Sequence, residues 1–159
     1  MIISALSCSP NTSGPVAKGR DLKKEKYNVI AVIGDGSLSG GEALEGLDWA
    51  IELNSNLIIV VNDNQMSIAE NHGGLYDNLK ELRNSGGKCS NNLFRALGLN
   101  YIYVSDGNDI KSLIYAFNVV KDSSSPIVVH INTLKGKGYH FAETEKERFH
   151  WSAPFDITT

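Results

Sequence analysis

The sequence has few cysteines and no excess of basic residues, and both shortages exclude classes of protein. Only two cysteines occur among 159 residues, Cys8 and Cys89, and neither stands in a CxxC or other metal-type spacing. Such usage is typical of reduced thiols in a cytoplasmic protein rather than of a disulfide framework. Fifteen Lys and Arg against eighteen Asp and Glu give a net charge of −3. Since nucleic-acid-binding and membrane-surface proteins normally show a basic excess, we expect neither kind of partner.

Long apolar runs are also missing. The longest ones, such as residues 29–33 and 57–61, are far shorter than the ~20 residues that a helix needs to cross a bilayer. The first residues lack a basic region followed by a sustained apolar stretch, so we do not expect a signal peptide. A hydrophobic fraction of 42% and a charged fraction of 21% are ordinary for a globular protein. We expect a cytoplasmic location.

Apolar strands alternate with amphipathic helices along most of the chain. Almost wholly apolar strands are predicted at residues 28–33, 57–61, 101–104 and 127–131. Between the first two, apolar residues at three- and four-residue spacing predict a helix that faces the sheet: Ala43, Leu44, Leu47, Ala50 and Ile51. Two short helices follow, one with Leu75, Leu79 and Leu82 and one with Leu93, Phe94 and Leu97. Asp109 is the expected N-cap of a helix whose apolar residues are Ile110, Leu113, Ile114, Phe117 and Val120. This order predicts an α/β fold with a mainly parallel sheet flanked by helices.

The first 27 residues do not follow this pattern. Pro10, Gly14 and Pro15 are expected to interrupt any continuous helix there. The charged run over residues 21–26 is typical of a surface turn. We therefore divide the chain into an atypical N-terminal segment, 1–27, and a domain, 28–159.

Polar residues follow two of the predicted strands at the point where each strand ends. Gly34-Asp35-Gly36 follows the first strand, and Asn62-Asp63-Asn64 follows the second. In parallel sheets, ligands bind at the carboxyl ends of strands. The Asp35 carboxylate and the Asn64 amide oxygen suit a hard cation such as Mg²⁺, which also keeps positions for phosphate oxygens. The two tripeptides together therefore predict a Mg²⁺-diphosphate site.

Neighbouring residues support this prediction, although each tripeptide alone is a weak signal. The glycines allow close backbone approach to a ligand, and Ser37 and Ser39 add hydroxyls at the entrance to the next helix. Asp-Gly is, however, a common turn after a strand. Haloacid-dehalogenase-type phosphatases also carry Gly-Asp-Gly, but there Asn-Asp follows at once, where this chain has Ser37-Leu38. The pairing of Asp35 with Asn64, 29 positions later, is more specific.

This pairing resembles the thiamine diphosphate motif, Gly-Asp-Gly followed one helix later by an Asn-containing strand end. Over about residues 17–159 the chain resembles the 1-deoxy-D-xylulose-5-phosphate synthase family, in the runs GDGSLSGGEALEGLDWA, NDNQMSIAENHGGL, YVSDGNDIKSLIYAF, PIVVHINTLKGKGYHFAE and FHWSAPFD. The NDNxMSI and HxxTxKGxGY elements separate this family from transketolase and from pyruvate dehydrogenase E1. The resemblance implies a thiamine diphosphate-binding fold. It also implies a transferase that condenses pyruvate with glyceraldehyde 3-phosphate for isoprenoid precursor and thiamine biosynthesis.

The resemblance also implies roles for individual residues. It makes Asp35 and Asn64 Mg²⁺ ligands, with the backbone carbonyl of Met66 as the third. Gly36, Ser37 and Asn64 are expected to contact the diphosphate. Tyr139 matches a family position near the cofactor, and the alternative is a packing residue at the end of a Gly-rich loop.

Basic side chains near these motifs leave alternatives open. Lys135 and Lys137 either reach phosphate or are ordinary exposed lysines of a Gly-rich loop. Among the histidines, His130 is expected to be a hydrogen-bonded core residue because it lies in an apolar strand. His72 is a candidate for approaching a ligand. The other two, His140 and His150, are expected at the surface.

The chain departs from the family in two respects. The family enzyme has three domains, and the glutamate that activates the cofactor's aminopyrimidine is expected downstream of Thr159, in the second domain. A histidine near the substrate and a Gly-His-Ser motif are replaced by an irregular stretch, residues 8–14. We therefore assign no catalytic residue in this chain.

Two hypotheses of different kind follow from these departures. In the first, the chain is a piece of the enzyme, such as a split subunit, which is inactive alone and works as a homodimer or with a partner chain carrying the pyrimidine domain. In the second, it is a non-catalytic remnant or binding module.

Overall fold

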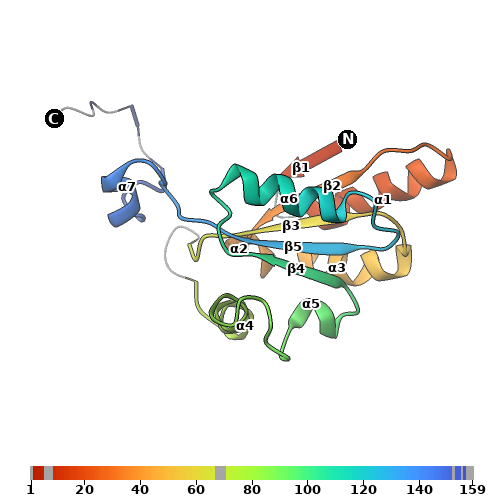
Figure 1. Ribbon diagram of the computed structural model, residues 1–159, viewed down its shortest axis with the longest axis horizontal. Coiled ribbons are helices and arrows are strands. Elements are labelled where there is room, and N and C mark those ends of the chain that lie inside the picture. The colour runs from red at the N-terminus through yellow and green to blue at the C-terminus, as the bar shows by residue number, and fades with distance from the viewer. Residues whose placement is uncertain (1, 6–8, 67–70, 152, 155, 157–159) are drawn as a thin grey trace.

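Five parallel strands form one sheet in the computed structural model, which describes residues 2–5, 9–66, 71–151, 153, 154 and 156 (Figure 1). Their order across the sheet is β1-β2-β3-β5-β4, so β2, β3 and β5 are central. The strands are β1 (Ile2–Ala5), β2 (Val29–Gly34), β3 (Ile58–Asp63), β4 (Asn100–Val104) and β5 (Ile127–Asn132). All neighbouring strands pair in parallel, which confirms the predicted α/β fold.

Helices cover both faces of this sheet. They are α1 (Ser9–Leu22), α2 (Asp35–Leu38), α3 (Gly41–Leu53), α4 (Gly74–Asn84), α5 (Leu93–Ala96), α6 (Ile110–Val120) and α7 (His140–Thr144). Helix α6 packs on one face, while α1, α3, α4 and α5 share a core with the other (Figure 1). Within the described part of the chain, no helix is both long and apolar enough to span a membrane.

The two strands that carry the polar tripeptides continue slightly further than predicted. Strand β2 ends at Gly34 and β3 ends at Asp63, and the two pair with Gly34 opposite Asn62. Parallel pairing brings both carboxyl ends to the same edge of the sheet. The predicted loop after β2 also contains a short helix, α2, which begins at Asp35.

The expectation that the N-terminal segment holds no continuous helix is wrong. Helix α1 spans 14 residues and includes Pro15. Tight packing against α3 accounts for this, because a Cβ at Gly14 would lie 2.1 Å from the Trp49 ring and one at Gly46 would lie 2.4 Å from the backbone nitrogen of Asn11. Two glycines thus let the helices approach closely, and this packing outweighs the low helix propensity of α1. Both β1 and α1 join the rest of the fold, while the boundary at residue 27 stays a prediction.

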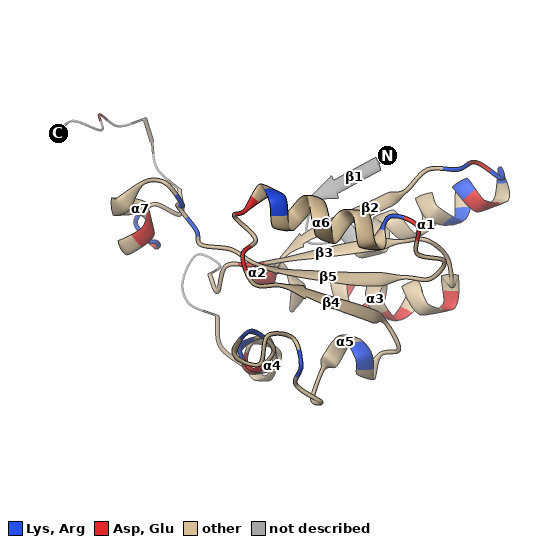
Figure 2. Ribbon diagram, in the orientation of Figure 1, with Lys and Arg blue, Asp and Glu red and all other residues tan. Residues whose placement is uncertain are grey.

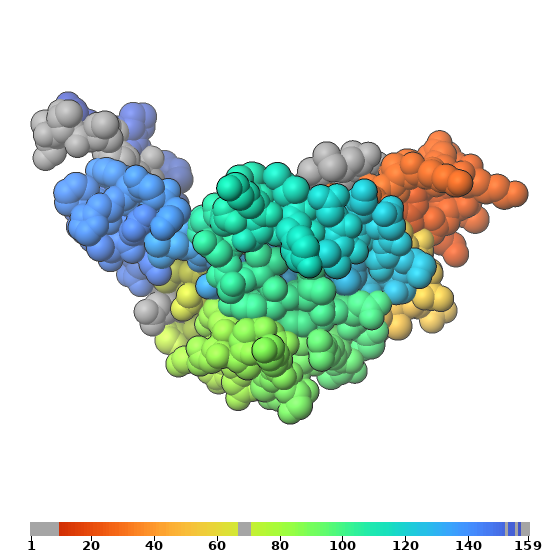
Figure 3. Space-filling view, viewed as in Figure 1, coloured from red at the N-terminus to blue at the C-terminus, as the bar shows by residue number. Residues whose placement is uncertain are grey.

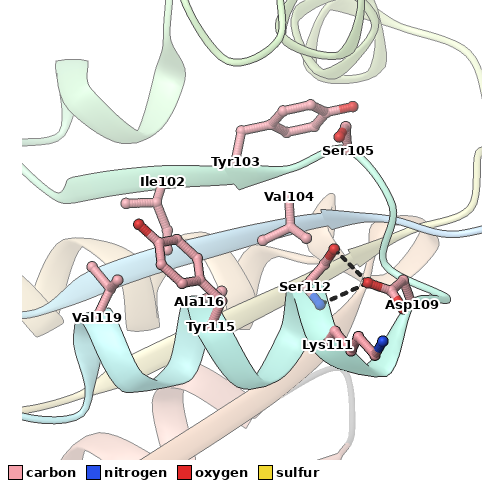
Figure 4. Close-up of a pocket in the computed structure, with 10 residues that line it drawn as sticks. All are labelled: Ile102, Tyr103, Val104, Ser105, Asp109, Lys111, Ser112, Tyr115, Ala116 and Val119. Atoms are coloured by element: carbon pink, nitrogen blue, oxygen red, sulfur yellow. Dashed lines mark hydrogen bonds between the residues drawn. The ribbon is translucent and has the colours of Figure 1, made fainter.

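The predicted N-cap of α6 is confirmed, whereas part of the predicted apolar face of this helix does not pack on the sheet. The Asp109 carboxylate accepts hydrogen bonds from the amide and the hydroxyl of Ser112, at 2.8 and 2.7 Å (Figure 4). Ala116 and Val120 are buried against the sheet, but Ile110 and Ile114 are exposed. The spacing gives the period of a helix, but it does not settle which of several adjacent apolar stripes meets the sheet. Leu44 of α3 is likewise exposed rather than buried.

Several segments gather where the central strands end. Helix α2 begins directly after β2, and the chain leaving β5 runs to α7 on the same side of the molecule (Figure 1). In Figure 3 the segment around α7 projects beside this end of the body. The carboxyl edge of the sheet is therefore the place where loops from distant parts of the sequence meet.

Candidate functional site

Asp35 and Asn64 meet at the carboxyl edge of the two central strands. The backbone N–H of Asn64 points at Oδ1 of Asp35 over 3.5 Å, and the Asn71 side-chain amide donates to Oδ2 at 2.8 Å. Helix α2, whose acidic residue is Asp35, lies near the ends of the central strands (Figure 2). Only 1% of the Asp35 surface is exposed. The structure thus brings together the two residues that the sequence singled out.

The Asp35 carboxylate is buried, and its surroundings shift its pKa. Burial raises its pKa, and the charge of Asp63 adds to this effect, while hydrogen bonds from Asn64, Asn71 and Gly36 oppose it. Within the described ranges, no basic side chain forms an ion pair with Asp35. A buried carboxylate without a counter-ion is costly, and a bound cation would remove this cost.

The donor set at this edge fits Mg²⁺ better than a softer metal. In the part of the chain that the structure describes, no three or more His, Cys, Asp or Glu side chains converge on one point. Asp35, Asn64 and the Met66 backbone offer oxygen donors. Oxygen donors suit a hard cation that retains water and phosphate oxygens as its other ligands.

A cavity of about 390 Å³ opens beside Asp35. Its lining residues come from the loop after β3, from α4 and from the C-terminal segment: Asp35, Gln65, Met66, Asn71, His72, Tyr76, Asp77, Lys80, Arg83 and Lys146. His72 is thus exposed at the wall of this cavity, where the sequence made it a candidate for ligand contact. Gly36 and Ser37 follow Asp35 in α2 and are half-buried.

A larger cavity, of about 550 Å³, lies between β4 and α6 and is a poorer candidate. Its walls are mainly apolar side chains such as Ile102, Val104 and Val119 (Figure 4). The carboxylate at its rim, that of Asp109, already caps α6. None of the residues predicted for the site lines it.

A buried polar network behind the Asn64 loop was not found from the sequence. Asp63 is fully buried, and its Oδ2 contacts both the Arg83 guanidinium and Nε2 of His130, the latter at 2.9 Å. On the other side of the ring, Nδ1 of His130 lies 2.8 Å from the hydroxyl of Tyr101. The prediction of His130 as a hydrogen-bonded core residue is confirmed. The members of this network come from β3, α4, β4 and β5, which no sequence signal connects.

The ionisation of this network follows from its surroundings. Burial works to raise the pKa of Asp63, but the hydrogen bonds and charges of His130 and Arg83 outweigh burial and hold that pKa below its usual range. Burial also raises the pKa of Tyr101 far above its usual value. Asp63 is therefore an anion and Tyr101 a phenol at neutral pH. The two carboxylates of the edge thus differ, because Asp63 forms an ion pair with Arg83, whereas Asp35 forms none with a described basic side chain.

The loop that carries Asn64 is a tight turn. The Asn64 side-chain oxygen accepts a hydrogen bond from the Met66 amide at 3.1 Å, and Oδ1 of Asp63 accepts one from the Gln65 amide at 3.1 Å. Gln65 has a φ of 67°, a left-handed conformation that costs a non-glycine residue free energy. Met66 is 8% exposed and lines the cavity beside Asp35.

The Gly-rich segment after β5 places its residues around the same edge. Tyr139 packs at 5.6 Å from the rings of Phe141 and Phe149, and it does not line the cavity beside Asp35. Lys135 contacts His150, which is exposed. Burial lowers the pKa of Lys135, and the charge of Asp35 opposes this, which shows that the lysine lies within the field of that carboxylate.

The fold and this edge define a class of protein. A solved structure from Mycobacterium smegmatis, described as that of a thiamin diphosphate-dependent enzyme, shares the fold with a TM-score of 0.56 over 78% of this chain and 21% of its own, at 16% identity. The protein thus has the fold of the thiamin diphosphate-dependent enzymes.

The particular family follows from the sequence comparisons. Residues 4–90 and 86–133 match the family model of 1-deoxy-D-xylulose-5-phosphate synthase, and the chain belongs to this family. The synthase of Carboxydothermus hydrogenoformans is 39% identical over 91% of this chain and 29% of its own length. That of Clostridium tetani is 36% identical over 96% of this chain and 31% of its own length. The chain therefore spans about a third of these curated relatives.

Proposed function

We propose that the chain binds thiamine diphosphate and Mg²⁺ at the carboxyl edge of β2 and β3. In this proposal Asp35, Asn64 and the Met66 carbonyl hold the cation. Gly36, Ser37 and Asn64 contact the diphosphate, and Tyr139 lies near the cofactor. The main support is the buried Asp35 carboxylate, which contacts Asn64 but has no ion-pair partner among the described residues. Membership of the synthase family, together with the fold shared with a thiamin diphosphate-dependent enzyme, supports the choice of cofactor.

The residues of this chain would bind the cation and the diphosphate and would not transfer protons. Asp35 would neutralise part of the cation's charge, and Asn64 would add a neutral oxygen, so that the cation could still bind diphosphate oxygens. Thiamine diphosphate, when bound, supplies the carbanion-stabilising chemistry of its thiazolium ring. No described residue of this chain is assigned to the removal of the proton that this chemistry requires.

Calorimetric titration of thiamine diphosphate into the chain, with and without Mg²⁺, tests this proposal. We expect saturable binding that needs Mg²⁺ and that Asp35→Asn abolishes. The matched control is Asp109→Asn, which makes the same chemical change at the α6 cap, far from the cavity, and keeps a residue that caps well. Absence of Mg²⁺-dependent binding to the wild-type chain would favour the non-catalytic remnant.

We also propose that residues 1–159 do not catalyse the reaction by themselves and need a domain that carries the pyrimidine-activating glutamate. The full-length relatives are about three times as long as the aligned part, and the pyrimidine-activating glutamate has no counterpart assigned here. The complete enzyme would act on pyruvate and glyceraldehyde 3-phosphate in the cytoplasm, either as a homodimer or with a partner chain that carries the pyrimidine domain. The purified chain with cofactor should form no 1-deoxy-D-xylulose 5-phosphate, and addition of a pyrimidine-domain chain should restore the product.

A further inference from the structure

The Asp63 side chain lies within the polar tripeptide of the candidate site, yet both of its oxygens are already used. Oδ2 is held by the Arg83 guanidinium, which lines the cavity, and by the fully buried His130 at 2.9 Å. Oδ1 accepts the Gln65 amide at 3.1 Å. The carboxylate is also fully buried. Asp63 therefore joins the sheet to the Gln65 amide in the loop that follows it.

His130 fixes the direction in which this carboxylate points. A carboxylate only accepts hydrogen bonds, so Nε2 of His130 carries the proton that faces Asp63. In the neutral imidazole the other ring nitrogen, Nδ1, accepts the hydroxyl proton of Tyr101 at 2.8 Å. The imidazole is fully buried and packs in a T-shaped arrangement with the Tyr103 ring, at a centroid distance of 5.2 Å. Neither its position nor its tautomer is free to change without loss of a hydrogen bond.

The loop held in this way has a conformation that it would not keep alone. Gln65 stands at a φ of 67°, and the Asn64 side chain closes the turn onto the Met66 amide at 3.1 Å. A left-handed non-glycine residue persists only where its surroundings hold it. The amide of Asn64 points at Asp35 in this conformation. The arrangement of Asn64 relative to Asp35 thus depends on what holds Asp63.

We infer that the buried chain Tyr101–His130–Asp63 is a positioning network, which holds the Asn64 loop in the geometry that binds the cation and excludes Asp63 itself from the ligand set. This inference rests on the proposed Mg²⁺-diphosphate function of the edge. Tyr101 and His130 do not line the cavity beside Asp35, so they act through Asp63. Groups that orient a ligand from behind are a recurrent part of metal sites.

The test compares two variants of the network with a variant of a buried arginine elsewhere. His130→Phe keeps the ring volume and removes both hydrogen bonds, while Tyr101→Phe removes only the hydroxyl and keeps the ring that stacks on Phe94. The control is Arg20→Met. Arg20 is 4% exposed and ties the opposite edge of the sheet through the Asn56 carbonyl, at 2.8 Å.

Two measurements are made on each chain: the Mg²⁺ concentration dependence of thiamine diphosphate binding, and the hydrogen exchange of the Gln65 amide without ligand. We expect His130→Phe to weaken Mg²⁺ binding about ten- to a hundredfold, with a smaller loss in Tyr101→Phe. Gln65 exchange should accelerate in the same order. Arg20→Met should lower the melting temperature and change neither measurement.

Each outcome bears on a separate claim. If the wild-type chain binds no cofactor, the proposed function fails, and Gln65 exchange still decides whether the network holds the loop. If His130→Phe leaves both the Mg²⁺ dependence and the exchange at wild-type values, the positioning network is wrong. The same conclusion follows if Arg20→Met changes both quantities as strongly as His130→Phe does, because the effect would then reflect general stability.

Discussion

The backbone amide of Asn64 points at the Asp35 carboxylate over 3.5 Å, across the carboxyl edges of two neighbouring strands. Residues 29 positions apart in the chain are thus in contact, and one of them is a carboxylate with 1% of its surface exposed. This contact depends on the register of β2 and β3, in which Gly34 lies opposite Asn62. Four predictions follow from this edge and from the packing that supports it.

Removal of the Asp35 charge should stabilise the ligand-free chain and abolish its response to ligand. Burial and the charge of Asp63 both disfavour ionised Asp35, so Asp35→Asn should raise the melting temperature without ligand at pH 7. In the wild type, Mg²⁺ with thiamine diphosphate at 100 times the dissociation constant should add about 2.7 kcal/mol of stability. Differential scanning fluorimetry with and without ligand measures both effects. A ligand shift that persists in Asp35→Asn would contradict the assignment of the ligand.

The stabilisation due to Asp63 should depend on pH. The pKa of Asp63 is lower in the folded chain than the ordinary value of 3.8. The contribution of Asp63 to the free energy of unfolding is therefore complete above pH 3.8 and is lost as the pH falls through the folded pKa. Asp63→Asn leaves Arg83 without its partner and should cost about 3 kcal/mol at pH 7. Urea unfolding of the wild type and of Asp63→Asn, from pH 7 down to pH 2, should show that the difference in their free energies of unfolding becomes smaller in acid. A difference independent of pH would argue against an ionised Asp63.

The close approach of α1 and α3 should tolerate no side chain at Gly46. A Cβ there would lie 2.4 Å from the Asn11 backbone nitrogen, so Gly46→Ala should destabilise the fold by about 1–3 kcal/mol. The control is Gly19→Ala in α1, where a Cβ meets nothing within 4 Å. That change should be neutral or stabilise by about 0.5–1 kcal/mol, because alanine favours a helix interior. Chemical denaturation of the two variants decides between packing and propensity.

The cap of α6 should affect stability but not ligand binding. Asp109→Ala removes the hydrogen bonds to the Ser112 amide and hydroxyl, and it should cost about 1 kcal/mol. Because Asp109 does not line the cavity beside Asp35, Mg²⁺-dependent binding of thiamine diphosphate should stay at the wild-type level. Thermal unfolding and calorimetry on the same preparation check both parts. Loss of binding in this variant would show that α6 is coupled to the site.

Strands β2 to β5 and helices α3 to α6 were predictable because their signals are local, whereas β1 was not predicted. Asp109 caps its helix three residues from its partner, and the apolar runs of β2 and β3 have the pattern of strands buried on both faces. The pairing of Asp35 with Asn64 was predictable for a related reason, since parallel strand ends meet at one edge.

The remaining features depend on contacts between residues distant in sequence. Arg83 and Tyr101 join Asp63 and His130 only through the packing of α4 and β4 on the central strands, and no spacing in the sequence indicates this. Helix α1 was missed because Gly14 was read as a helix breaker. In the fold it makes room for Trp49, and this packing stabilises the helix. The exposure of Ile110 and Ile114 depends likewise on how α6 is rotated on the sheet.

The parallel unit β2–α3–β3 also sets the order in which the edge is assembled during synthesis. The contact between Asp35 and Asn64 closes over 29 residues, and it is available once the chain has been made through β3. The contact between Asp63 and His130 spans 67 residues and must wait for β5, the last strand. Closing the longer loop costs more entropy, though only logarithmically. A chain interrupted before β5 would therefore contain both candidate ligands but lack the His130 contact to the turn over residues 63–66.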